Sequence, residues 1–161
     1  MTLVDLQIAL ANNVNVAAFL HAIRLGEGTS DDAGYNRIVG GGSFTDMSRH
    51  PNQRVWIPKY QVWSTAAGAY QIIHPTWEGL VTQYGFPDFE PPSQDCMAVA
   101  LIAEKGALDM IIAGDLAGAV AACASIWASL PGSQAGQHME AFDAVQTCYL
   151  ENGGSIEQSS A

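Results

Sequence analysis

Glu27 is the residue whose position points most directly to chemistry. It continues an apolar stripe made by Val16, Leu20 and Ile23, and steps of four, three and four residues place these side chains on one helix face. Gly28 follows, which indicates that the helix ends there. A partly buried carboxylate at the negative end of a helix dipole resists ionisation, so its pKa rises toward the range of a general acid. The alternative interpretation is an exposed glutamate that falls in phase by chance.

Metal and thiol chemistry find little support in the sequence. The cysteines form no Cys-x-x-Cys pair, and the histidines show no ligand spacing. We therefore expect no metal and no organic cofactor, because acid–base chemistry at a carboxylate needs neither. The residues concerned are Cys96, Cys123, Cys148, His21, His50, His74 and His138.

The elements that must position Glu27 are mostly helical. Thr2 and Asp5 have the spacing of a capping box for a first helix, and a second helix runs from about Asn15 to Glu27. Between 31 and 61, clustered glycines and alternating aromatic and β-branched residues predict short strands, as at 35–39 and 55–57. Later helices are expected at 75–85 after Pro75, 93–105 with Ser93 as cap, 108–113, 115–124 with Asp115 as cap, and 137–150.

This pattern predicts one α+β domain over residues 1–154, with a small β-rich lobe at about 31–62 and a disordered tail at 155–161. The chain has 161 residues, enough for one core, and its net charge is −10. Residues 1–60 carry as many basic as acidic residues, whereas 61–161 carry Lys105 against eleven acids. Such a field repels phosphate backbones and anionic lipid, so nucleic-acid binding and membrane insertion are not expected. We expect a monomer.

Several blocks of sequence, in order, resemble the bacteriophage lambda endolysin family. They cover about Asn15 to Gly154, and several are long enough to be specific. The blocks are Glu27-Gly28-Thr29, Gly34-Tyr35, Ile38-Val39-Gly40-Gly41, Phe44-Thr45-Asp46, His50-Pro51, Ser64 to Gln71, Pro92-Ser93-Gln94-Asp95, Glu104 to Leu108, and Ile126-Trp127-Ala128-Ser129-Leu130-Pro131-Gly132.

The resemblance implies a lysozyme-like fold with a substrate cleft between its lobes, and a peptidoglycan lytic transglycosylase. Such enzymes cleave the bond between N-acetylmuramic acid and N-acetylglucosamine without water, leaving a 1,6-anhydro end. The family's catalytic acid/base falls on Glu27. One carboxylate suffices for this chemistry, whereas a hydrolytic glycosidase usually needs two. Phage lysozymes of the hydrolytic type place an Asp nine residues after the catalytic Glu, where this chain has Asn36.

The resemblance also implies residues that contact the substrate. Ser64, Tyr70 and Gln71 belong to a Ser-x-x-x-Gly-x-x-Gln block, whose hydroxyl, ring and amide suit uncharged sugars. Trp56 and Trp63 flank the β-rich lobe and could line a sugar cleft, with core packing as the default. Further expected contacts are Tyr35, Asp46, His50, Ser129 and Gln137.

Alternatives and departures remain at this point. Asp31, Asp32 and Asp46 are possible second carboxylates for a hydrolytic muramidase, although we interpret the first two as solvated loop acids and Asp46 as a turn cap or sugar ligand. A non-catalytic glycan-binding or virion structural protein is the third reading. Leu25-Gly26 replaces the Trp-Ser found before the glutamate in the lambda protein.

The N-terminus has no basic segment of a signal peptide, so we expect synthesis in the host cytoplasm. The resemblance then implies action on the wall in the periplasm, after a separate protein has opened the membrane.

Overall fold

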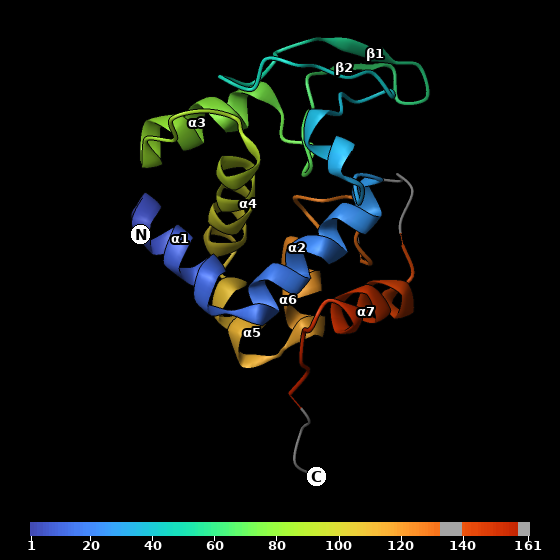
Figure 1. The fold of residues 1–161 in the computed structure, drawn as a ribbon. Coiled ribbons are helices and arrows are strands. Elements are labelled where there is room, and N and C mark those ends of the chain that lie inside the picture. The colour runs from blue at the N-terminus through green and yellow to red at the C-terminus, as the bar shows by residue number, and fades with distance from the viewer. Residues whose placement is uncertain (133–139, 158–161) are drawn as a thin grey trace.

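The computed structural model describes residues 1–132 and 140–157 and confirms the predicted α+β class (Figure 1). Within these residues the chain forms seven α-helices, one short 3-10 helix and a two-stranded sheet. The helices gather into one body, and the sheet lies at its upper end in Figure 1. This arrangement leaves the small β-rich lobe next to the C-terminal end of α2, where Glu27 lies.

The first two helices meet at a sharp bend. α1 covers Leu3–Asn12 and α2 covers Val14–Glu27, with a bend of 95° between them. The predicted capping box is present, because Thr2 accepts a bond from the Asp5 amide and Asp5 accepts one from the Thr2 amide. Among the described helices, none is long and apolar enough to cross a membrane singly, although this bent pair passes the same test of length and composition.

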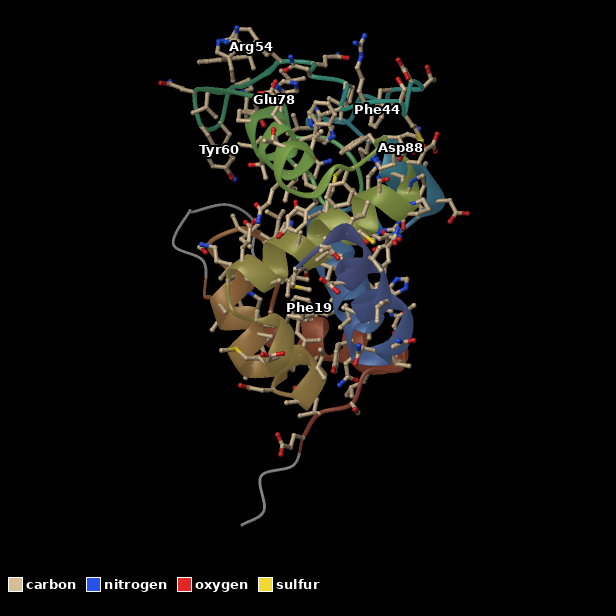
Figure 2. All side chains as sticks on the ribbon, turned by 90° about the vertical axis from the view of Figure 1, so that its left-hand side faces the viewer. Phe19, Phe44, Arg54, Tyr60, Glu78 and Asp88 are labelled. Atoms are coloured by element: carbon tan, nitrogen blue, oxygen red, sulfur yellow. The ribbon has the colours of Figure 1, made fainter. Side chains whose placement is uncertain are left out.

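α2 is the central helix of the core. The predicted stripe of Val16, Leu20 and Ile23 is buried, and α2 packs against α7, which covers Phe142–Glu151. Phe19, on the same helix, lies inside the helical body in Figure 2 and is fully buried. The helix ends at Gly28, which has a left-handed backbone with φ of 71° that glycine adopts at little cost.

The β-rich lobe holds fewer strands than the sequence predicts. β1 (Val55–Ile57) and β2 (Val62–Ser64) pair antiparallel, which confirms the strand predicted at 55–57. The strand predicted at 35–39 is wrong, because Asp32–Asn36 is a 3-10 helix and the next two residues form only isolated bridges. Bonds from Arg24 hold this segment, and a local pattern of alternation does not reveal such distant partners.

The remaining helices surround the core. They are α3 (His74–Tyr84), α4 (Pro91–Glu104), α5 (Leu108–Ala113) and α6 (Leu116–Cys123). The starts predicted from Pro75 and Asp115 are confirmed.

Two predicted helix starts are wrong. Glu90 precedes α4, and Ser93 lies inside its first turn with its hydroxyl donating to Asp88 at 2.6 Å. α7 begins at Phe142 rather than near Gln137, because Glu140 and Ala141 are not helical; residues 133–139 lie outside the described part.

The chain after α7 is fixed to the helical body. The Ser155 amide donates to Asn15 Oδ1 at 2.9 Å, and the Glu157 amide donates to the Gly114 carbonyl at 3.0 Å. Tyr149 donates its hydroxyl to the Ser155 carbonyl at 2.8 Å. Residues 155–157 therefore depart from the expected disordered tail, and residues 158–161 lie outside the described part.

Candidate active site

Glu27 is the last residue of α2 and is partly buried. Burial disfavours its charged form and raises the pKa of its carboxyl from 4.5 to about 7. The Ser129 hydroxyl donates a hydrogen bond to Glu27 Oε1 at 3.3 Å, which favours the charged form and opposes this rise. Glu27 thus meets the requirement placed on it from the sequence: a carboxyl that exchanges a proton near neutral pH.

Ser129 is packed directly against the helix that carries Glu27. It is 7% exposed and lies after α6, where its carbonyl accepts a bond from the Glu140 amide at 2.8 Å. A Cβ atom on Gly26 would overlap the Ser129 hydroxyl. The glycine before Glu27 therefore makes room for a hydroxyl that arrives from a distant loop. Ser129 contacts the candidate catalyst, and its expected contact with substrate stays a prediction.

Arg24 holds the turn that follows Glu27. Its side chain is buried and donates to the Thr29 carbonyl at 2.8 Å and the Asp31 carbonyl at 2.6 Å. The guanidinium also lies over the Tyr35 ring, 4.4 Å from its centroid. Sequence reasoning gave Arg24 no role, although an arginine in the last turn of an apolar helix is unusual enough to mark it.

Tyr35 and Tyr70 share one acceptor. Their hydroxyls donate to Asp95 Oδ1 at 2.9 and 2.6 Å. Burial, followed by the charge of Asp95, raises the pKa of Tyr35 to about 12 and that of Tyr70 well above its usual value, so both remain neutral donors. Tyr70 is 2% exposed, which corrects the expectation that it offers a flat face to a sugar.

Gln94 organises the loop that carries Tyr70 and Gln71. This fully buried side chain accepts from the Ala69 amide at 2.8 Å and donates to the Tyr35 and Phe89 carbonyls at 3.0 and 2.8 Å. Gly68 has φ of 81°, and a Cβ there would overlap Gln94 Oε1. The glycine of the Ser-x-x-x-Gly-x-x-Gln block therefore admits an internal glutamine. The sequence block containing Gln94 was recognised without a role for this residue.

Gln71 is connected to the turn after Glu27 through hydrogen bonds of Arg37. Its amide donates to the Gly68 carbonyl at 2.9 Å and the Arg37 carbonyl at 3.4 Å. Arg37 in turn donates to the Gly28 carbonyl at 2.7 Å. The Thr29 hydroxyl also donates to the Ala69 carbonyl, so the loop and the turn are joined twice.

The remaining predicted residues are dispersed. Ser64 ends β2, and its hydroxyl accepts from the Ala66 amide at 3.2 Å. His50 is 2% exposed, with Nδ1 accepting from the Asn52 amide at 3.0 Å and Nε2 donating to the Ile72 carbonyl at 2.7 Å. Burial lowers the pKa of His50, so it is a neutral core residue, which corrects its expected contact with substrate. Gln137 lies outside the described residues.

The two acids that the sequence offers as a second carboxylate and that bond to other groups are Asp31 and Asp46. Asp31 pairs with Arg37 at 3.3 Å and is largely exposed. Asp46 is exposed and accepts from the Ser48 amide and hydroxyl at 2.9 and 2.6 Å, which lowers its pKa and fits the turn-cap interpretation. Among the described residues, no carboxylate is hydrogen-bonded to Glu27, and no group of three potential ligands could hold a metal.

A helical body with a small β-rich lobe, and a half-buried glutamate where they meet, places the chain in the class of α+β proteins with a lysozyme-like fold. The family model for endolysins matches residues 17–156. The chain is 41% identical to the endolysin of Escherichia phage lambda, over 88% of this chain and 92% of the relative. It is 39% identical to the endolysin of Escherichia phage P2, over 87% and 93%.

Solved structures agree with the sequence matches. Bacteriophage lambda lysozyme complexed with a chitohexasaccharide superposes with a TM-score of 0.84 at 40% identity, covering 90% of this chain and 97% of that one. A second structure of lysozyme from bacteriophage lambda gives 0.81 at 38% identity, with the same coverage. The chain belongs to the endolysin family, the phage enzymes that degrade the host cell wall, and this confirms the family, the fold and the endolysin function predicted from the sequence.

Proposed function

We propose that this endolysin is a lytic transglycosylase, which cleaves the β-1,4 bond between N-acetylmuramic acid and N-acetylglucosamine and leaves a 1,6-anhydro end. The proposal rests on the side chain of Glu27. Its half-buried carboxyl has a pKa of about 7, and among the described residues Ser129 alone forms a hydrogen bond to it. A single carboxyl near neutrality can first give and then take a proton, which is what this reaction demands.

The reaction needs one group in two protonation states. Protonated Glu27 gives its proton to the bridging oxygen as the bond from that oxygen to the muramic acid anomeric carbon breaks. The resulting carboxylate then removes the proton of the muramic acid 6-hydroxyl as its oxygen bonds to the same carbon. Glu27 ends protonated again, no water is consumed, and the substrate supplies the nucleophile.

The second step is helped by the contacts of Glu27. The Ser129 hydroxyl stabilises the carboxylate formed after proton donation, while burial keeps that carboxylate basic enough to accept the next proton. Lambda lysozyme is a structural relative seen with a chitohexasaccharide, which supports an amino-sugar chain as the ligand of the Glu27 site.

The mass spectrum of products from purified peptidoglycan tests the mechanism. We expect muropeptides ending in anhydro-muramic acid, lighter by one water than reducing-end products. Reducing ends throughout would show a hydrolytic muramidase, for which exposed Asp31 or Asp46 would have to position water. Glu27→Gln should lose about 10²–10⁴-fold in rate, the contribution typical of a general acid. Lysis by this variant at the wild-type rate would favour a non-catalytic role.

We also propose that the enzyme accumulates in the host cytoplasm and acts in the periplasm. Expression alone should leave cells intact, and chloroform treatment should then cause rapid lysis. Lysis without any membrane permeabilisation would contradict this order of events.

A further inference from the structure

An exposed aromatic pair covers one face of the β1–β2 hairpin. Trp56 and Trp63 are directly opposed in the antiparallel register, with ring centroids 5.4 Å apart. They remain 44% and 56% exposed, although tryptophan is normally well buried. The Arg54 guanidinium lies 4.9 Å from the Trp63 centroid. We name Arg54, Trp56 and Trp63 the hairpin platform. Lys59 is not part of it, because its ammonium lies over the ring of Tyr60, 5.3 Å from the centroid.

The charge of this segment is opposite to that of the whole chain. Residues 47–77 contain Arg49, Arg54 and Lys59 and no acidic residue, whereas the whole chain carries −10. Half of the six basic residues thus lie in this segment. A local positive field on an acidic protein favours contact with an anionic partner at this one place.

The platform faces away from the candidate active site. Figure 2 shows Arg54 at the outer edge of the β-rich lobe, directed away from the helical body, while Tyr60 extends on the body's side. Because Arg54 stacks on Trp63, that ring belongs to the outer side as well. Within the described residues, the hydrogen bonds that connect to the turn after Glu27 run through Arg37 and Gln71 and do not involve the two tryptophans.

We infer that the hairpin platform is a second glycan-binding surface, which holds a peptidoglycan strand outside the cleavage site. This inference rests on the proposed function, since it takes its ligand from the same polymer. The apolar faces of pyranose rings stack on indole rings, and a carboxylate of the stem peptides pairs with Arg54. A strand bound here keeps the enzyme on the insoluble wall between cleavages.

Binding to purified, insoluble peptidoglycan tests the surface. All proteins carry Glu27→Gln, so the polymer is not consumed during sedimentation. We expect Trp56→Ala with Trp63→Ala to weaken binding at least 10-fold. Ile112→Ala, which removes a similarly exposed apolar side chain on α5, should bind as the parent does.

A charge-reversal variant guards against misfolding of the hairpin. Arg54→Glu changes a residue that precedes β1 and should weaken binding at least 10-fold at low salt, with less salt dependence than the parent. Parental affinity in Arg54→Glu or in the double tryptophan variant overturns the inference, as does platform-dependent binding to vesicles containing anionic lipid in place of peptidoglycan. The proposed function fails separately, if the enzyme with its natural Glu27 releases no anhydro-muropeptides.

Discussion

The hydrogen bond from Ser129 to Glu27 shifts the balance between the two protonation states that the proposed reaction uses. Burial alone pushes the carboxyl toward its neutral form, and the hydroxyl partly restores the charged form. A distant loop thereby tunes the group at the end of α2. Gly26, the residue before the glutamate, leaves the space that the Ser129 hydroxyl occupies in this chain.

Removal of the Ser129 hydroxyl should move the pH dependence of the enzyme. In Ser129→Ala the carboxylate loses a donor, so the pKa of Glu27 rises and the alkaline limb of kcat/KM shifts to higher pH. The rate at neutral pH should fall about 10-fold, because a hydrogen bond to a charged group contributes about 1.5–3 kcal/mol. A merely structural role would lower the rate without moving the limb. Ser93→Ala, which removes a hydroxyl bonded to Asp88, is the matched control.

Glu27 also costs the fold stability at neutral and alkaline pH. Its pKa rises from 4.5 to about 7 on folding, so the native protein binds more protons than the unfolded chain between these values. The contribution of the Glu27 carboxyl to the free energy of unfolding is therefore fully present below pH 4.5 and is lost as pH rises through about 7. Glu27→Gln should raise the free energy of unfolding by up to about 3 kcal/mol at pH 8 and by little at pH 4, measured by urea titration. An equal effect at both pH values would contradict the burial of this carboxyl.

At the scale of elements, the loop from Ser64 to Gln71 depends on a glutamine contributed by α4. The Gln94 side chain forms hydrogen bonds with the loop, with the 3-10 helix and with Phe89, just before α4. Gly68 has no side chain and so leaves space for Gln94. The conformation of this loop therefore depends on its packing against α4.

Gln94→Ala should destabilise the protein by about 3 kcal/mol, because three buried backbone groups lose their partner. Activity should fall together with stability, since the same loop carries Gln71. Thermal unfolding and a lysis assay measure the two effects. Gln83→Ala, on the exposed side of α3, should change neither.

Periodicity and capping chemistry predicted most helices, because those preferences are local. The stripe from Val16 to Glu27 and the Thr2–Asp5 capping box needed no tertiary information. The 3-10 helix at Asp32–Asn36 was mistaken for a strand because Arg24 determines its form. The start of α7 was misplaced for lack of a clear capping residue.

At the scale of the whole molecule, the residues of the candidate site also fall into those that local sequence predicts and those whose roles depend on tertiary contacts. Spacing singles out Glu27 as the carboxylate on an apolar helix face, and the family resemblance is what implies its role as the catalytic acid/base. Tyr70 and His50 were assigned to substrate because their side chains suit sugars, yet both are buried. The roles of Arg24 and Gln94 arise only when segments distant in sequence meet.

The fastening of residues 155–157 between Asn15 and Gly114 has a practical consequence for engineering. Gly114 joins α5 to α6, at the end of the body opposite β1 and β2 in Figure 1. A fusion partner appended after this segment would lie at the end of the helical body opposite β1 and β2, away from both Glu27 and the hairpin platform. Targeting modules for new bacterial hosts are therefore better grafted at this terminus than beside the sheet.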